Sequence, residues 1–156
     1  MTFDGEAVLA RFRARFADLT GASPFPWQAR LYRAFHAFDD IQARPRRLDV
    51  PTGLGKTSVM TIWWIAREVG APVPRRLVYV VDRRAVVDQA TTEASNLKAW
   101  AGTPDLAVST LRGQYADNRA WLANPAAPAI VVGTIDMIGS RLLFSGYGVS
   151  RGMRPF

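Results

Sequence analysis

The residues with the clearest chemistry lie in the run DVPTGLGKTS, Asp49–Ser58. Its two glycines, Gly53 and Gly55, can adopt the backbone angles that turn successive N–H groups toward an anion. A predicted helix beyond them adds its positive N-terminal dipole. Lys56 would reach the β- and γ-phosphates of a nucleotide as the catalytic lysine, and the Thr57 hydroxyl would ligate Mg²⁺. The residues predicted to bind the nucleotide are Thr52, Gly53, Leu54, Gly55, Lys56, Thr57 and Ser58.

A glutamine upstream of this run is a candidate for base recognition. The segment PFPWQARLY, Pro24–Tyr32, places Gln28 28 residues before Lys56. A glutamine amide donates and accepts hydrogen bonds together, which matches the N6 and N7 edge of adenine. We therefore predict that Gln28 reads adenine, and that ATP with Mg²⁺ is the cofactor pair.

Arginines follow the ends of several predicted strands. DRRAVVDQ, Asp82–Gln89, places Arg83 and Arg84 at the start of a helix, where guanidinium groups can hold a phosphodiester backbone. STLRGQ, Ser109–Gln114, and VGTIDMIGSRLL, Val132–Leu143, repeat the combination of a strand end, threonine and glycine with a nearby arginine. Three such strand ends together predict a track for nucleic-acid phosphates.

Two amphipathic helices are predicted ahead of the phosphate-binding run. The first covers about residues 5–19, and its apolar residues recur at helical spacing: Leu9, Phe12, Phe16 and Leu19. Gly21–Pro26 interrupts the pattern. The second helix carries an apolar stripe made of Trp27, Leu31, Phe35 and Phe38.

From Arg46 onward, short apolar runs alternate with helical stretches. The expected strands are 48–50, 76–81, 106–110 and 129–133, and the expected helices are 57–69, about 84–100, 116–123 and 135–143. Strands that are apolar on both faces and separated by helices imply an α/β fold, with a parallel sheet flanked by helices on both faces. Ligands bind such sheets at the carboxyl ends of the strands, where the polar motifs fall. Trp63 and Trp64 follow the loop and are expected in the core rather than stacked on bases.

Composition narrows the classes of function. The 156 residues suit one domain, and the absence of cysteine excludes disulfides, thiolate metal sites and a cysteine nucleophile. The single histidine, His36, argues against a histidine metal cage and is expected to be a packing residue. The net charge of +7 comes almost wholly from arginine, since Lys56 and Lys98 are the only lysines, and it favours a polyanionic partner. No apolar run reaches the length of a membrane span and no signal peptide is evident, so we expect a soluble cytoplasmic protein.

Together these segments resemble the first RecA-like lobe of superfamily 2 helicases, and most closely the helicase-nuclease of type I CRISPR systems. The motifs that carry the resemblance are PTGLGKTSVMTIWW, YVVDRRAVVDQA and IVVGTIDMIGSRLLFSGYG, within a similarity that runs from Pro24 to the end. Val50 replaces the glycine that opens the general phosphate-loop pattern, and the helicase form does not require that glycine. The resemblance implies an ATP-dependent DNA helicase of antiviral defence that is recruited by a CRISPR surveillance complex. It also places Arg83, Arg84, Arg112, Gly113 and Thr134 in segments that contact single-stranded DNA.

The sequence departs from that family in one important motif. The apolar strand ending in Asp-Glu-x-His, which holds Mg²⁺ in the family, has no counterpart because no Asp-Glu dipeptide occurs in the chain. We therefore expect a partial protein, with an N-terminal amphipathic helix over 1–22 and an incomplete P-loop (RecA-like) ATP-binding domain over 23–156. A second lobe with its arginine finger is also missing, and that finger alone is worth roughly 10³–10⁵ in rate. The chain alone is thus predicted to bind nucleotide weakly and to hydrolyse it barely.

Two other functions remain open from the sequence. LVYVVD, Leu77–Asp82, is itself an apolar strand ending in an aspartate, so the chain could be a small phosphotransferase in which Asp82 assists Mg²⁺. Alternatively, the chain could be a non-catalytic module that binds nucleic acid through its basic face, with a vestigial phosphate loop.

Overall fold

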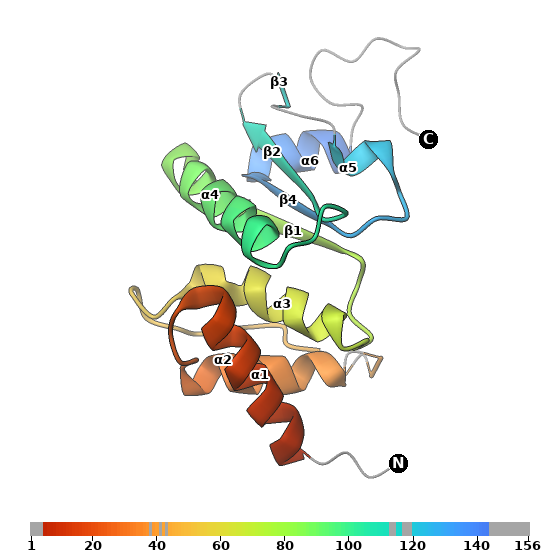
Figure 1. The fold of residues 1–156 in the computed structure, drawn as a ribbon. Coiled ribbons are helices and arrows are strands. Elements are labelled where there is room, and N and C mark those ends of the chain that lie inside the picture. The colour runs from red at the N-terminus through yellow and green to blue at the C-terminus, as the bar shows by residue number, and fades with distance from the viewer. Residues whose placement is uncertain are drawn as a thin grey trace. The chain divides into compact units, whose positions relative to one another are not determined.

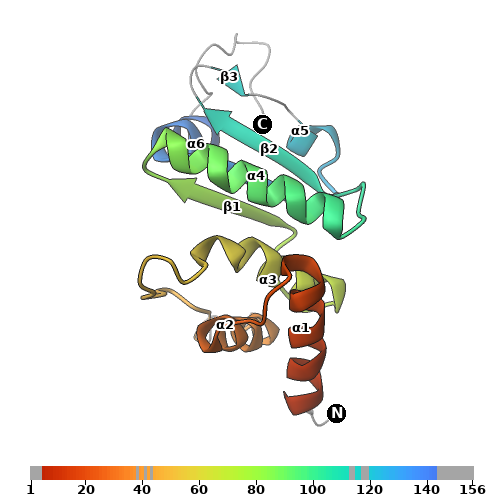
Figure 2. The same cartoon turned by 60° about the vertical axis from the view of Figure 1, so that its left-hand side comes forward.

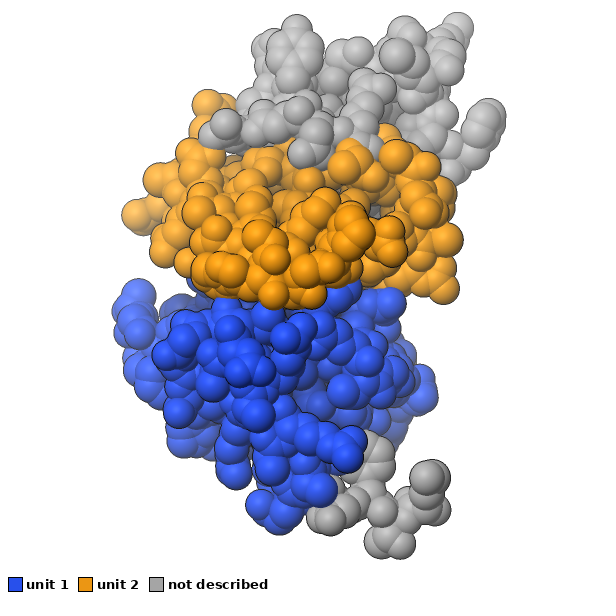
Figure 3. Space-filling view, viewed as in Figure 1, with its two compact units in different colours: residues 1–74 blue, residues 75–156 orange. Residues whose placement is uncertain are grey.

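A computed structural model of the protein describes residues 5–37, 39–40, 42, 44–112, 115–116 and 120–143. The chain forms two compact units, residues 1–74 (unit 1) and residues 75–156 (unit 2), which Figure 3 colours separately. The phosphate-binding run belongs to unit 1, and the arginine-bearing strand ends belong to unit 2.

Unit 1 is helical. Its elements are α1 (Gly5–Thr20), α2 (Pro26–His36), the short 3-10 helix η1 (Lys56–Ser58) and α3 (Val59–Glu68). The predicted stripe of α1 is buried, and its Phe12 ring stacks on Tyr32 of α2 at a centroid distance of 4.3 Å. Arg15 of α1 binds Glu68 of α3 through two hydrogen bonds of 2.8 and 2.9 Å.

The two helices predicted ahead of the loop are confirmed. The stripe residues Trp27, Leu31 and Phe35 of α2 are buried, and Phe38 lies outside the described residues. Pro26 occupies the first turn of α2, where its missing N–H costs the helix nothing. Together, these apolar faces form the interior of unit 1.

Unit 2 is an α/β unit built on a four-stranded sheet. Its strands are β1 (Arg76–Val81), β2 (Ala107–Arg112), β3 (Tyr115–Ala116) and β4 (Ala129–Thr134), in the order β1-β4-β2-β3. The pairs β1–β4 and β4–β2 are parallel, whereas β3 is antiparallel to β2. All six residues of β4 are buried, which fits the central strand of a sheet that is covered on both faces.

Helices pack on both faces of this sheet. They are α4 (Arg84–Trp100), α5 (Ala120–Ala123) and α6 (Ile135–Leu143). Figures 1 and 2 show α4 across one face of the strands and α6 across the opposite face. The predicted parallel α/β sheet with helices on both faces is therefore confirmed, and α4 and α6 have the predicted bounds.

One predicted strand is wrong, and one predicted helix is wrong at its first residue. Residues 48–50 form no strand, because none of the described strands pairs with them, and the Val50 carbonyl accepts a hydrogen bond from the Lys56 ammonium. Of the helix expected over 116–123, the described residues form α5 over Ala120–Ala123. Ala116, at its predicted start, instead belongs to β3, which pairs with the end of β2.

Candidate nucleotide and nucleic-acid sites

The phosphate loop, residues 52–57, bends at its two glycines. Gly53 has φ 85°, and Gly55 has φ 68° with ψ 39°, which is the left-handed region. An L-residue in that region brings its Cβ too close to the following carbonyl, so glycine is the residue that adopts it readily. The bend leads directly into η1 and α3, as the sequence predicted.

The N–H groups of this loop are available to a ligand. Within the described part of the chain, no hydrogen-bond partner is found for the amides of Thr52, Gly53, Gly55, Lys56 or Thr57. The next amide along, that of Ser58, donates to the Gly55 carbonyl at 3.1 Å. Free N–H groups in turn conformations at the start of a helix are the usual protein ligands of a phosphate. The loop therefore fits a polyphosphate.

Two side chains of the loop extend this fit. The Lys56 ammonium donates to the Val50 carbonyl at 2.9 Å, so in the unbound loop it rests on a neutral acceptor. A phosphate oxygen is a stronger acceptor for an ammonium, because both partners are charged. The half-buried Thr57 hydroxyl makes no hydrogen bond to a described residue and is free to ligate Mg²⁺.

Gln28 lies against the phosphate loop, but its side-chain amide is already hydrogen-bonded to protein groups. The side chain is 2% exposed. Its Oε1 accepts from the Phe25 amide at 2.6 Å, and its Nε2 donates to the Ser58 hydroxyl at 2.7 Å. That hydroxyl in turn donates to the Gly55 carbonyl at 2.6 Å. The structure thus brings the predicted Gln28 and Ser58 together, and in the unbound protein both side chains bind protein groups.

Trp27 is a loop contact that sequence reasoning missed. Its indole Nε1 donates to the Leu54 carbonyl at 3.0 Å, and the side chain is 6% exposed. Its place on the apolar stripe of α2 identified it as a core residue, and that burial is confirmed. A hydrogen bond to a carbonyl 27 residues away leaves no signal in the sequence.

In unit 2, the carboxyl ends of the parallel strands carry the residues predicted to contact nucleic acid. Val81 pairs with Thr134, so β1 and β4 end side by side, and Arg83 and Arg84 follow β1 directly. Arg112 ends β2 on the other side of β4. Gly113 lies outside the described residues.

Arg84 and Thr134 meet at the exposed carboxylate of Asp136. A hydrogen bond from Thr134 holds the pKa of the Asp136 carboxyl below its ordinary value. Hydrogen bonds from the backbone amides of Asp136 and Met137 and the positive charge of Arg84 act in the same direction. The strand ends of β1 and β4 therefore form one polar cluster.

The remaining residues singled out in the sequence are Asp82 in unit 2 and Trp63 and Trp64 in unit 1. The exposed carboxylate of Asp82 lies 3.8 Å from the Arg83 guanidinium, which competes with any cation. Trp63 and Trp64 are buried, as predicted, and their indole N–H groups bind the Pro74 carbonyl and the Glu68 carboxylate. Among the described residues, no group of three His, Cys, Asp or Glu side chains could hold a metal.

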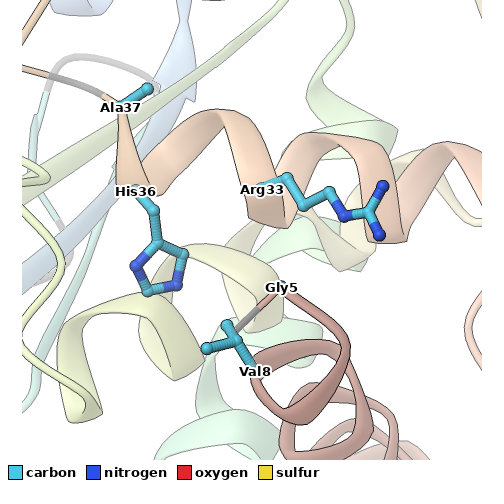
Figure 4. A pocket seen from close by; sticks show the side chains of 5 residues that line it. All are labelled: Gly5, Val8, Arg33, His36 and Ala37. Carbon is cyan, nitrogen blue, oxygen red and sulfur yellow. The ribbon is translucent and has the colours of Figure 1, made fainter. Parts of the chain in front are cut away.

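A separate pocket of about 350 Å³ lies in unit 1 beside His36. Figure 4 shows the imidazole reaching from α2 toward Val8 of α1, with Gly5, Arg33 and Ala37 completing the lining. His36 contacts the Tyr32 ring edge-on at 4.8 Å, and burial lowers the pKa of His36. The histidine is thus a packing residue, as expected, and no residue of the phosphate loop lines this pocket.

The parallel sheet of unit 2, with helices on both faces, has the α/β architecture of an incomplete RecA-like lobe. The phosphate loop of unit 1 lies ahead of this sheet in the sequence. Residues 22–147 match the family described as type III restriction enzyme, res subunit. The match covers most of the chain, and the protein belongs to this family, whose matched part is the N-terminal lobe of superfamily 2 helicases. The predicted superfamily and the ATP-binding, helicase-like lobe are thereby confirmed. Comparison with curated proteins found no match.

Of the helices that the structure describes, none combines the length and the apolar character needed to cross a bilayer.

Proposed function

We propose that this chain is the ATP- and nucleic-acid-binding lobe of an ATP-dependent DNA helicase of CRISPR antiviral defence. The observation that carries the ATP part is the row of loop amides without partners among the described residues, next to Lys56 and the free Thr57 hydroxyl. These loop residues are exposed or half-buried, so their amides face water that a phosphate can replace.

In this proposal different groups of the loop bind different parts of ATP with Mg²⁺. The amides of residues 52–57 hold the phosphate oxygens, Lys56 exchanges the Val50 carbonyl for phosphate, and Thr57 offers its hydroxyl to the metal. Bound ATP with Mg²⁺ supplies a phosphoanhydride bond whose hydrolysis can drive movement along DNA. Gln28 and Ser58 would contact the nucleotide only after giving up one of their present hydrogen bonds.

The chain offers a matched pair of variants for this test. Lys56→Ala removes the loop ammonium, whereas Lys98→Ala removes the only other lysine, on α4 of unit 2. Loss of a charge-assisted hydrogen bond of about 1.5–3 kcal/mol should weaken binding of a non-hydrolysable ATP analogue about 10- to 150-fold in Lys56→Ala. Lys98→Ala should bind like wild type in the same fluorescence titration. Equal affinities for all three proteins would refute the ATP site.

The DNA part of the proposal is supported by the charge of +7 and by the cluster at the carboxyl ends of β1 and β4. Contacts between DNA phosphates and three arginines, Arg83, Arg84 and Arg112, predict a slope near −2 when the logarithm of single-stranded DNA affinity is plotted against that of salt. Arg84→Ala should make this slope shallower. The matched control is Arg13→Ala, an exposed arginine on α1. An unchanged slope in Arg84→Ala would remove this residue from the DNA contact.

The CRISPR assignment rests on the sequence resemblance over the three motifs given above. We propose residues 23–156 as the ATP-binding lobe, acting in the cytoplasm beside a surveillance complex, and slow hydrolysis by this chain alone, since it contains no Asp-Glu pair. The coding sequence that follows Phe156 tests the assignment. We expect an apolar strand ending in Asp-Glu-x-His, then a second lobe and a nuclease domain. Coding sequence of a restriction subunit in its place would refute the CRISPR role.

A further inference from the structure

Two successive carbonyls of the phosphate loop are held by side chains from outside it. The Leu54 carbonyl accepts the Trp27 indole N–H at 3.0 Å. The Gly55 carbonyl accepts the Ser58 hydroxyl at 2.6 Å, and Gln28 donates to that hydroxyl at 2.7 Å. Both Trp27 and Gln28 lie in the first turn of α2. This helix end therefore contacts the Leu54 carbonyl directly and the Gly55 carbonyl through the Ser58 hydroxyl, beside the Ser58 amide that donates to the same carbonyl at 3.1 Å.

The direction of a carbonyl fixes the direction of the next amide. A peptide group is planar, and in its trans form the C=O of one residue and the N–H of the next point in opposite directions. A bond that holds the Leu54 carbonyl toward Trp27 therefore turns the Gly55 N–H away from Trp27. The Gly55 carbonyl and the Lys56 N–H are related in the same way. These are two of the amides that have no partner among the described residues.

The side chains that hold these carbonyls are themselves fixed. Trp27 is 6% exposed and Gln28 is 2% exposed, so neither side chain has water as a ready alternative partner. Gln28 is further tied to the Phe25 amide at 2.6 Å. Glycine at position 55 allows the peptide groups on either side of it to rotate more freely than another residue would. The hydrogen bonds to the Leu54 and Gly55 carbonyls therefore help to fix the orientation of these two peptide groups.

We infer that Trp27 and Gln28 are positioning residues that orient the Gly55 and Lys56 amides for a phosphate. In this role they do not touch the phosphate; they act on it through the carbonyls of Leu54 and Gly55. This inference deepens the proposed function and depends on it, because it concerns the same loop.

A matched pair of tryptophan variants tests the inference. Trp27→Phe keeps an aromatic ring and removes the indole N–H. Trp63→Phe does the same to an equally buried tryptophan whose N–H binds the Pro74 carbonyl at 3.0 Å, also within unit 1. The probe is inorganic pyrophosphate, titrated by calorimetry. We expect about 3- to 10-fold weaker binding in Trp27→Phe and wild-type affinity in Trp63→Phe.

Nuclear magnetic resonance gives a readout that a loss of packing would not produce. On addition of pyrophosphate, the Gly55 and Lys56 amide signals of the wild-type protein should shift, while the Trp27 indole N–H signal keeps its position and its protection from exchange. In Trp27→Phe the unbound Gly55 amide signal should move relative to wild type, and in Trp63→Phe it should not.

The outcomes separate the two proposals. Wild-type protein that binds neither pyrophosphate nor ATP overturns the proposed function, and this inference with it. Wild-type binding that is weakened equally in both variants, or unchanged in Trp27→Phe, overturns the inference alone. If Trp27→Phe fails to fold, the wild-type titration decides, since pyrophosphate binding without a shift of the Gly55 and Lys56 amides contradicts the assigned role.

Discussion

Replacement of Gly55 by alanine separates backbone strain from a specific side-chain contact. Gly55 has φ 68°, where an L-residue costs about 1–2 kcal/mol. A Cβ there would lie 3.3 Å from the Gln28 Nε2, which is tighter than an ordinary contact. Gln28 would have to move, and weakening its bond to Ser58 costs about a further 0.5–1.5 kcal/mol. We expect Gly55→Ala to lose about 1.5–3.5 kcal/mol of unfolding free energy.

The control for this prediction is Gly53→Ala. Gly53 has φ 85°, and a Cβ there would meet nothing within 4 Å, so only the strain of about 1–2 kcal/mol applies. Urea denaturation of both variants measures the difference. In a Gln28→Ala background the extra loss at position 55 should disappear, because the crowding atom is gone. Equal losses for the two glycines in the wild-type background would refute the argument.

Three further predictions concern charge. Burial lowers the pKa of His36, so below about pH 6.5 the unfolded chain binds more protons than the folded one. The unfolding free energy should therefore decrease as the pH is lowered from 8 to 5, and His36→Phe should lack this contribution. Urea titrations between pH 5 and 8 measure both. Thr134→Val should raise the pKa of Asp136, which carboxyl chemical shifts report, and an unchanged pKa would contradict the assigned hydrogen bond. Arg15→Lys should lower the unfolding free energy by up to about 1 kcal/mol, because lysine cannot form the two parallel hydrogen bonds to the Glu68 carboxylate. A urea denaturation midpoint equal to that of the wild type would count against this prediction.

Regular elements with strong patterns were predictable from the sequence. The helix over 84–100 and the strand over 76–81 have the predicted bounds, because apolar spacing alone determines them. Residues 48–50 show the limit of that method. Their apolar character resembles a strand, but a strand also needs a partner, and no local pattern says whether one is supplied.

The candidate nucleotide site also has one feature that the sequence predicted and others that it could not predict. Glycines ahead of Lys56 imply a bend whatever the rest of the chain does, and the bend is present. The hydrogen bonds of Trp27 and Gln28 could not be predicted, since each joins two groups about thirty residues apart in the sequence. Such hydrogen bonds form only when the helix packs against the loop, and tryptophan and glutamine also occur in helices that make no such contact.

The position of β4 in the sheet has a consequence for biosynthesis. β4 is the last of the three parallel strands to leave the ribosome, yet it lies between the other two. Until Ala129–Thr134 has emerged, β1 and β2 each lack their native neighbour and present unpaired backbone groups along an apolar strand. Nascent chains are therefore most exposed to misassembly in the interval between the emergence of β2 and the emergence of β4.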